Sequence, residues 1–452
     1  MLIADAAGAS WYRIKLAICL IAGALAGGGT AVALLGHEPA STQRTGLAPE
    51  ASSVRYRFAA AIARDDTNAT IAALEARVKE MRSPFDLGEL AELYLRRAQR
   101  DGDADDYRRA EDAAQRSLAV LRAPNGAVLT LAKLAATRHQ FREAIALAQE
   151  QLGHKRSAAP YAVMATAHLA LGELAAATEA ANAALALEPD SGSYLTRALV
   201  LAAQGRDGEA AYDFARAASL EQFGDPQGAA RLRALWARFL LRRGELVGAR
   251  ELLAEALRIV PEYPLALAYQ GELALREGRP EKARAQLEQA FAASRQVRYL
   301  IEQARAQEVT GDRDGADITR AQVEQIVRAE LVEGGLGHRL DLVEVLVDRG
   351  AHLAEAVALA REEVARRPGA DARFQLARAL ARTGKLDDAL AQLQAALDTG
   401  ARDARLFELA AELEQQRGDA TRAELFHADA ERLDPGGAGL RYAGAGAGAG
   451  AP

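Results

Sequence analysis

The chain has 452 residues and a formal net charge of −6, with 50% hydrophobic and 26% charged residues. This composition is typical of a globular protein and excludes a wholly disordered one. The acidic balance gives no support to nucleic-acid binding, which usually shows as a basic excess. The only cysteine is Cys19, which excludes an internal disulfide and any cysteine-based zinc or iron–sulfur site.

The first 36 residues carry a membrane signal. Arg13 and Lys15 precede an uncharged run, residues 16–36, that is just long enough to span a hydrocarbon core of ~30 Å as a helix. No basic residue follows before Arg44, so the rule for positive charges favours a cytoplasmic N-terminus with the rest of the chain outside the cytoplasm. A cleaved signal peptide is the alternative, because Ala24-Leu25-Ala26 matches a cleavage signature. A buried or irregular segment is the third interpretation.

Two segments lack hydrophobic periodicity. Residues 37–52 are rich in Pro, Ser, Thr and Gly and predict a flexible linker. Residues 437–452 contain an alternating Ala-Gly run and predict a low-complexity, disordered tail. The folded domain is therefore expected over residues 53–436, beginning with a helical pair at about 53–82.

A repeat of about 34 residues fills residues 88–436. Alanine recurs at spacings of 33 to 40 residues, and we take each such alanine as the opening of a second helix. Twelve residues earlier the residue is small in nine of ten repeats, and five residues earlier it is glycine in seven. The marker alanines are Ala110, Ala144, Ala177, Ala210, Ala249, Ala283, Ala316, Ala356, Ala389 and Ala423.

The pattern predicts two antiparallel helices per repeat. Glycine ends the first helix, where the chain needs a positive φ that glycine adopts at little cost. Small residues stand where helices approach closely. Pro189, Pro261, Pro368 and Pro435 lie twelve residues after a marker and end the second helix. One repeat cannot bury its apolar face alone, so neighbouring repeats should stack into a continuous core.

This pattern resembles the tetratricopeptide repeat (TPR) family. The best matches are Tyr161, Ala165, Gly172-Glu-Leu, Ala177, Ala181, Ala184 and Pro189 in the third repeat, and Trp236-Ala237, Gly244-Glu-Leu, Ala249, Ala256 and Pro261 in the fifth. The resemblance implies an all-α fold, a right-handed α-solenoid of about ten helix-turn-helix repeats.

Several positions depart from the pattern. His139 replaces the usual glycine of the second repeat, and Glu344 occupies the small position of the eighth, which we expect to be shifted by one residue. A turn-rich insertion between residues 220 and 230 and an extension between 323 and 338 predict breaks in the array near 225 and 335. These breaks are either loop variation or part of a binding face.

Signatures of catalysis are missing from the sequence. It contains no H-E-x-x-H, G-x-x-x-x-G-K-[ST], G-x-S-x-G or C-x-x-C motif, and its seven histidines are scattered over different repeats. The acidic residues 101–106 lack the ligand spacing of a calcium loop and predict a turn and helix start. We therefore expect no enzymatic activity, no cofactor and no metal.

The resemblance implies a concave surface lined by the first helices. Carried over by position, it predicts a leucine-lined groove with arginine side chains able to pair with carboxylates of a bound peptide. The predicted partner-binding residues are Leu195, Leu199, Arg231, Arg238, Leu241, Leu275, Arg298, Ile301, Arg305, Phe374 and Arg378. The alternative is that these arginines are solvated or form ion pairs within the chain.

The leading functional hypothesis is a scaffold that binds protein or peptide segments, held at the cell envelope by residues 16–36 or exported after signal cleavage. It would act in bacterial envelope assembly, secretion or polymer export, without nucleic acid or a small-molecule substrate. A soluble cytoplasmic regulatory adaptor is the alternative. An enzyme with a recognition arm is disfavoured, because no segment over 60 residues is left for a catalytic domain.

Overall fold

The computed structural model describes residues 47–58, 67–332 and 337–436. Every described residue belongs to one compact part of the chain, which lies within Thr45–Pro452. The predicted membrane signal, residues 37–46 of the linker and the Gly/Ala tail lie outside the described residues. Within the described ranges the secondary structure is entirely helical, and none of these helices is long and apolar enough to cross a membrane.

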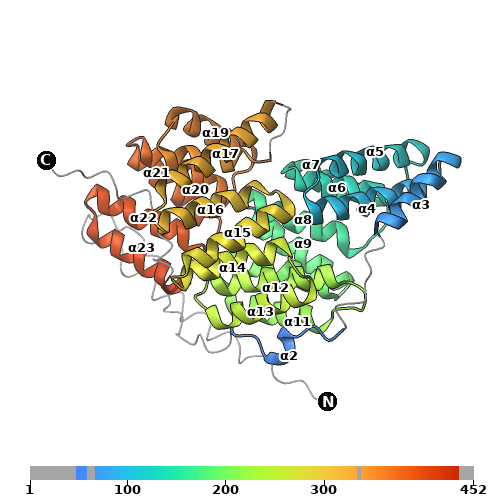
Figure 1. The fold of residues 1–452 in the computed structure, drawn as a ribbon, viewed down its shortest axis with the longest axis horizontal. Coiled ribbons are helices and arrows are strands. Elements are labelled where there is room, and N and C mark those ends of the chain that lie inside the picture. The colour runs from blue at the N-terminus through green and yellow to red at the C-terminus, as the bar shows by residue number, and fades with distance from the viewer. Residues whose placement is uncertain (1–46, 59–66, 333–336, 437–452) are drawn as a thin grey trace, which may run out of the picture. The chain divides into compact units, whose positions relative to one another are not determined.

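Ten helical pairs follow one another along the chain, as the repeat predicts (Figure 1). The all-α, TPR-like solenoid is therefore confirmed. The pairs are α4 (Pro84–Asp101) with α5 (Ala104–Val120), α6 (Ala127–Thr137) with α7 (Phe141–His154), α8 (Ala158–Leu171) with α9 (Leu174–Leu187), α10 (Ser191–Ala203) with α11 (Asp207–Ser219), α12 (Pro226–Leu241) with α13 (Leu246–Ile259), α14 (Pro264–Arg276) with α15 (Pro280–Ser294), α16 (Val297–Val309) with α17 (Arg313–Val332), α18 (Arg339–Arg349) with α19 (Leu353–Arg366), α20 (Ala370–Arg382) with α21 (Leu386–Leu397), and α22 (Ala404–Arg417) with α23 (Ala420–Leu433).

The marker alanines lie where the helices of a repeat pack together. Nine of the ten are fully buried, and Ala423 is 6% exposed. Gly271 shows why the facing position must be small. A Cβ atom there would lie 2.8 Å from Cγ of Leu287, too close for a side chain in a well-packed interior.

The turn between the helices of a repeat has the predicted backbone. Gly172 and Gly384, for example, have φ values of 76° and 77°. His139 adopts the same left-handed conformation with φ of 60°, although it carries a side chain. In the eighth repeat the turn residue is Gly350, six residues before Ala356, which confirms the one-residue shift.

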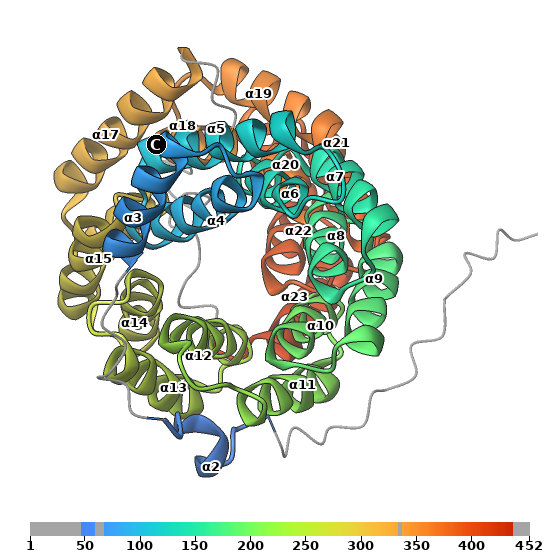
Figure 2. The same ribbon diagram turned by 90° about the vertical axis from the view of Figure 1, so that its right-hand side faces the viewer.

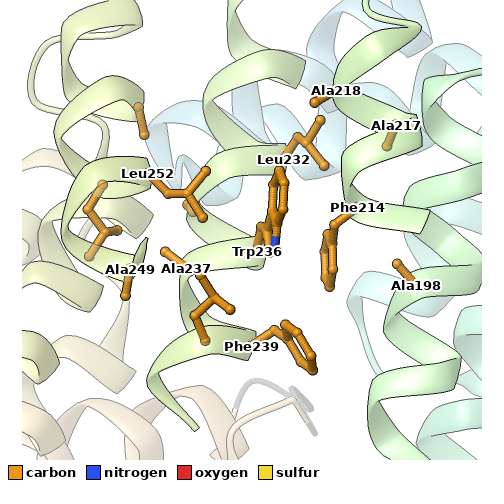
Figure 3. Close-up of a cluster of buried hydrophobic side chains, with 14 of the residues drawn as sticks. Ala198, Phe214, Ala217, Ala218, Leu232, Trp236, Ala237, Phe239, Ala249 and Leu252 are labelled. Carbon is orange, nitrogen blue, oxygen red and sulfur yellow. The ribbon is translucent and has the colours of Figure 1, made fainter. Parts of the chain in front are cut away.

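The hydrophobic core continues across both predicted breaks. One cluster of buried side chains extends from Leu195 to Leu273, past the insertion near 225, and includes Trp236 stacked on Phe214 with ring centroids 5.8 Å apart (Figure 3). A second cluster extends from Val297 to Leu413, past position 335. The extension of the seventh repeat is present as the 20-residue helix α17. These features lengthen the repeats without dividing their core.

The N-terminal region differs from the predicted linker and helical pair. Helix α3 (Thr67–Glu80) packs on α4, but residues 47–58 hold only the single-turn helix α2 (Ala51–Val54) and pack against α11 and α13 instead. Leu47 and Tyr56 belong to the core cluster around Trp236. The sequence signal is the alternation Val54-Arg-Tyr56-Arg-Phe58, which has the period of two that an extended segment requires.

Turns of the first five repeats contact connections that lie five or six repeats later in the chain. The N–H of Arg402 donates to the carbonyl oxygen of Ala203 at 2.9 Å. A Cβ on Gly172 would lie 3.0 Å from Cα of Gly369, and one on Gly244 would lie 2.8 Å from the carbonyl oxygen of Pro435. The solenoid therefore winds so that its later turn rests on its earlier one.

Candidate partner-binding surface

In the part of the solenoid that the structure describes, the first helix of each repeat lies on the inner side. Figure 2 shows α8, α10, α12 and α14 inside the second helices α9, α11, α13 and α15. This is the side on which a concave binding surface is expected. The predicted residues on these helices divide into buried apolar side chains, paired arginines and arginines without a carboxylate partner.

The predicted apolar residues belong to the core more than to the surface. Leu241, Ile301 and Phe374 are at most 2% exposed, and Leu195 is 7% exposed. Leu199 is half-buried against the cluster that contains Leu195, and Leu275 is half-buried against a smaller cluster that contains Leu287. These side chains pack between neighbouring helices, so they leave little apolar surface for a partner.

Arg298 and Arg305 of α16 are paired within the chain. Nη1 of Arg298 lies 2.7 Å from Oε2 of Glu344, and its Nη2 lies 2.7 Å from Oε1 of Glu302. Arg305 bonds the same two carboxylates. Burial alone would raise the pKa of Glu344, but the nearby arginines outweigh it and hold the pKa far below its usual range.

Arg378 of α20 joins the same inner-face network. It donates to Oε1 of Gln375 at 3.1 Å and pairs with Asp348, while Nε2 of Gln375 donates to Glu344 at 2.9 Å. The unusual Glu344 thus acts as a buried acceptor that links α16, α18 and α20. For these three predicted arginines the structure supports pairing within the chain.

Arg231 and Arg238 of α12 are different. Within the described residues, neither forms an ion pair with a carboxylate. Arg231 is exposed, whereas the guanidinium of Arg238 stands 5.9 Å from the ring centroid of Tyr269 on α14. An aromatic face attracts a cation without neutralising its charge. The ring of Tyr269 therefore holds the Arg238 side chain in place while its guanidinium keeps its full charge.

Arg238 lies beside two further arginines, Arg242 at the end of α12 and Arg405 of α22, and we call these three residues the arginine cluster. Nη1 of Arg242 is 3.7 Å from Oδ2 of Asp403, and Nη2 of Arg405 bonds Asp403 at 2.6 Å and Asp371 at 2.9 Å. Arg242 and Arg405 thus pair with these two carboxylates, whereas Arg238 pairs with neither. Glu272 of α14 also acts favourably on the charges of Arg238 and Arg242.

The pKa of Arg242 is lowered by its surroundings. Burial is the largest cause, and the positive charges of Arg238 and Arg405 act with it to lower the pKa to about 10, against the opposing effects of Asp403 and Glu272. The side chain of Arg242 is nevertheless 36% exposed. Arg242 is therefore reachable by solvent while protein surrounds it, as expected on a concave face. An added anion would relieve the repulsion among the three cations.

Repeat spacing predicted Arg238 as a partner-binding residue but did not group it with Arg242, Asp371, Asp403 and Arg405. Arg242 follows the last predicted concave position of its helix, and its neighbours come from the ninth and tenth repeats. No local pattern shows that the fifth repeat meets the tenth. Within the described residues, no group of three or more His, Cys, Asp or Glu is placed to hold a metal ion.

Comparisons with known proteins give similarity in solved structures alone. No family model matches the chain, and no curated protein matches its sequence. The structure is similar to human IFIT1 with PPP-AAAA, at 14% identity and a TM-score of 0.45, covering 82% of this chain and 95% of that one. It is also similar to yeast Tom70, at 12% identity and a TM-score of 0.36, covering 82% of this chain and 89% of that one. These identities are too low to indicate a shared ligand.

Proposed function

We propose that this protein is a non-catalytic scaffold that binds an acidic segment of a partner protein at the arginine cluster. The observation that carries the proposal is the grouping of three arginines on the inner face. Among the described residues Arg238 pairs with no carboxylate, and Arg242 lies 3.7 Å from Asp403, which also pairs with Arg405. A carboxylate from a partner would complete the pairing, and guanidinium groups bind carboxylates with two parallel hydrogen bonds.

The Arg242 side chain is 36% exposed, which a chain segment bound along the inner helices can reach. Two cavities of the described structure, of about 670 and 250 Å³, lie among α3–α5 and α21–α23, away from the cluster. Small ligands are usually enclosed in a cavity that buries most of their surface. A peptide can instead pair one or two acidic side chains with Arg238 and Arg242 while the rest of it follows the inner helices.

Binding is tested with full-length protein and a fluorescein-labelled peptide of alternating Asp and Glu. Arg238→Glu combined with Arg242→Glu should weaken binding at least tenfold, because the site then repels the peptide. Arg122→Glu combined with Arg313→Glu is the matched control, since it makes the same charge change at two exposed sites. The control should bind within about twofold of wild type, and both proteins should keep the wild-type circular dichroism.

Two other results would contradict the proposal. Equal loss in both double variants would indicate attraction by net charge alone rather than by the cluster. Stronger binding of a single-stranded RNA oligonucleotide than of the peptide, also lost on changing Arg238 and Arg242, would replace the protein partner by a nucleic acid. The peptide affinity should fall as salt rises, since salt screens accessible charges.

We also propose that the scaffold works at the bacterial cell envelope, in assembly, secretion or polymer export. The support is the basic pair followed by the apolar run at residues 16–36. Crosslinking pull-downs of the full-length protein from separate membrane and soluble fractions of its host test this location. Recovery in the membrane fraction with envelope proteins supports it. A soluble protein that recovers cytoplasmic regulators would favour the adaptor function.

A further inference from the structure

The segment 47–58, which we call the strap, occupies a groove formed by α11, α12, α13 and the loop at 220–225. We propose that this groove is a peptide-recognition site for a segment with the Val-x-Tyr-x-Phe pattern of the strap, extended after the valine, and that it binds the strap sequence as a separate peptide. This site lies apart from the arginine cluster and serves a different ligand, the chain's own strap.

Charged side chains of the groove bind the main chain of the strap. The N–H of Tyr56 donates to Oε1 of Glu255 at 2.7 Å, and Nε of Arg233 donates to the carbonyl oxygen of Val54 at 2.6 Å. Hydrogen bonds with one charged partner are stronger than those between neutral groups. The two bonds hold the backbone on either side of Arg55, where the strap leaves α2 and becomes extended, with φ of −79° and ψ of 126° at Arg55.

Side-chain contacts select the residue types. Tyr56 is 3% exposed and faces the guanidinium of Arg233, 5.6 Å from its ring centroid. Phe58 packs edge-to-face against Tyr56 at 5.4 Å and against Phe223 at 5.9 Å. Val54 packs on the core cluster around Trp236. The alternate side chains of the strap are therefore read by contacts on one face, as in other modes of extended-peptide recognition.

The groove is held in shape by bonds that do not involve the strap. Arg233 is fully buried, and Glu221 accepts from its Nη1 and Nη2 at 2.5 and 3.2 Å while the carbonyl of Ala229 accepts at 3.0 Å. Glu221 and Phe223 come from the insertion that makes the fourth repeat long. The insertion therefore forms one side of the groove and supplies the carboxylate that binds Arg233.

A glycine also accommodates the strap. A Cβ on Gly248 of α13 would lie 2.8 Å from Cδ of Pro49. Since such a contact is closer than carbon atoms approach, any larger residue would displace Pro49. The groove is therefore complementary to the strap in its hydrogen-bonding groups, its aromatic contacts and its shape at Gly248.

The test uses full-length protein in which the strap is released by Tyr56→Ala and Phe58→Ala, titrated with a fluorescein-labelled peptide of residues 47–58. We expect this variant to bind the peptide at least tenfold more tightly than wild type. In wild type the attached strap competes at an effective concentration on the order of millimolar. A peptide carrying Tyr56→Ala is the matched control and should not bind. Adding Glu255→Ala to the released variant should abolish binding.

Absence of peptide binding to a released variant with wild-type circular dichroism would overturn the proposal. If that variant does not fold, amide hydrogen exchange in the wild-type chain provides the second measurement. The Tyr56 amide should then be protected, and Glu255→Ala should accelerate its exchange at least tenfold. An unprotected Tyr56 amide in the wild-type chain would equally overturn the proposal.

Discussion

The main-chain N–H of Arg402, just before α22, donates a hydrogen bond of 2.9 Å to the carbonyl oxygen of Ala203 at the end of α10. This bond joins the tenth repeat to the fourth, so the two turns of the solenoid are in direct backbone contact. Side-chain pairs support the same contact, including Arg276 with Asp434 at 2.8 Å. The rigidity of the inner face therefore depends on contacts between turns as well as on packing within repeats.

Gly369→Ala should open this contact between turns. Gly369 has φ of −69°, so alanine adds no backbone strain, but its Cβ would lie 2.3 Å from the carbonyl oxygen of Ala170. We expect the free energy of unfolding to fall by ~1–3 kcal/mol more than in Gly126→Ala. Gly126 is the matched control, since it also precedes a helix with φ of −68° and has nothing within 4 Å of the added Cβ. Equal urea midpoints for the two variants would contradict the close contact.

Ala249→Leu should be destabilising because the position lies where helices approach closely. Ala249 is fully buried, whereas Val247 on the same helix is 65% exposed. Extra methyl groups in a packed core typically cost ~1–3 kcal/mol. The change Val247→Leu should be nearly neutral and serves as the control. Thermal unfolding followed by circular dichroism compares the two variants, and similar melting temperatures would argue against the assigned packing.

Glu344→Leu should be severely destabilising because Arg298 and Arg305 lose the more buried of the two carboxylates that they share and keep only Glu302 in common. Loss of one partner from a buried ion pair typically costs ~3–5 kcal/mol. Glu362→Leu is the control, since Glu362 is 59% exposed in its pair with Arg339, and exposed pairs contribute at most ~1 kcal/mol. Urea unfolding at neutral pH measures both effects.

The contribution of Glu344 should also depend on pH in a definite direction. Its pKa is lowered on folding, so its stabilisation is present above the unfolded pKa of 4.5 and is lost as the pH falls through the folded pKa. The difference between wild type and Glu344→Leu should therefore stay constant from pH 8 to about pH 5. A difference that already decreases between pH 8 and 6 would contradict this account.

His139→Asn should reduce the sensitivity of the fold to mild acid. Nδ1 of His139 lies 2.8 Å from Nη1 of Arg367, and burial followed by Arg367 lowers the pKa of His139 to about 3. Because His139 stays neutral in the folded state, the unfolded state binds one more proton as the pH falls from 6.5 toward 3. The free energy of unfolding then decreases by up to roughly 1.4 kcal/mol per pH unit.

Asparagine tolerates the positive φ of position 139 and takes up no proton in this range. Urea midpoints are measured for wild type and the variant between pH 7 and pH 4.5. The midpoint of His139→Asn should therefore fall less steeply with decreasing pH than that of wild type. His139→Gly should show the same reduced slope, which separates the titration from the replacing side chain. If the urea midpoints of all three proteins fall in parallel with pH, His139 is not the group responsible for the acid sensitivity.

Local patterns in the sequence predicted the repeats well because their causes are local. The buried Ala177 and Ala249, the left-handed turn at Gly172 and the one-residue shift at Gly350 all follow from contacts within a repeat or with the next one. The strap was missed because the alternation of Val54, Tyr56 and Phe58 is short. Its groove is also formed by residues far along the chain, including Glu255, 199 positions from Tyr56.

The sequence by itself determined the helical pairs, their number and their turn geometry, since hydrophobic spacing and glycine placement act over a few helical turns. Only the tertiary structure decided which charges remain available. Arg305 and Arg238 look alike in the repeat pattern, yet Glu344 neutralises Arg305 while Arg238 meets the ring of Tyr269 and the later arginine Arg405. Winding brings the fifth repeat beside the tenth, and Coulomb energies depend on that distance in space and not on separation along the chain.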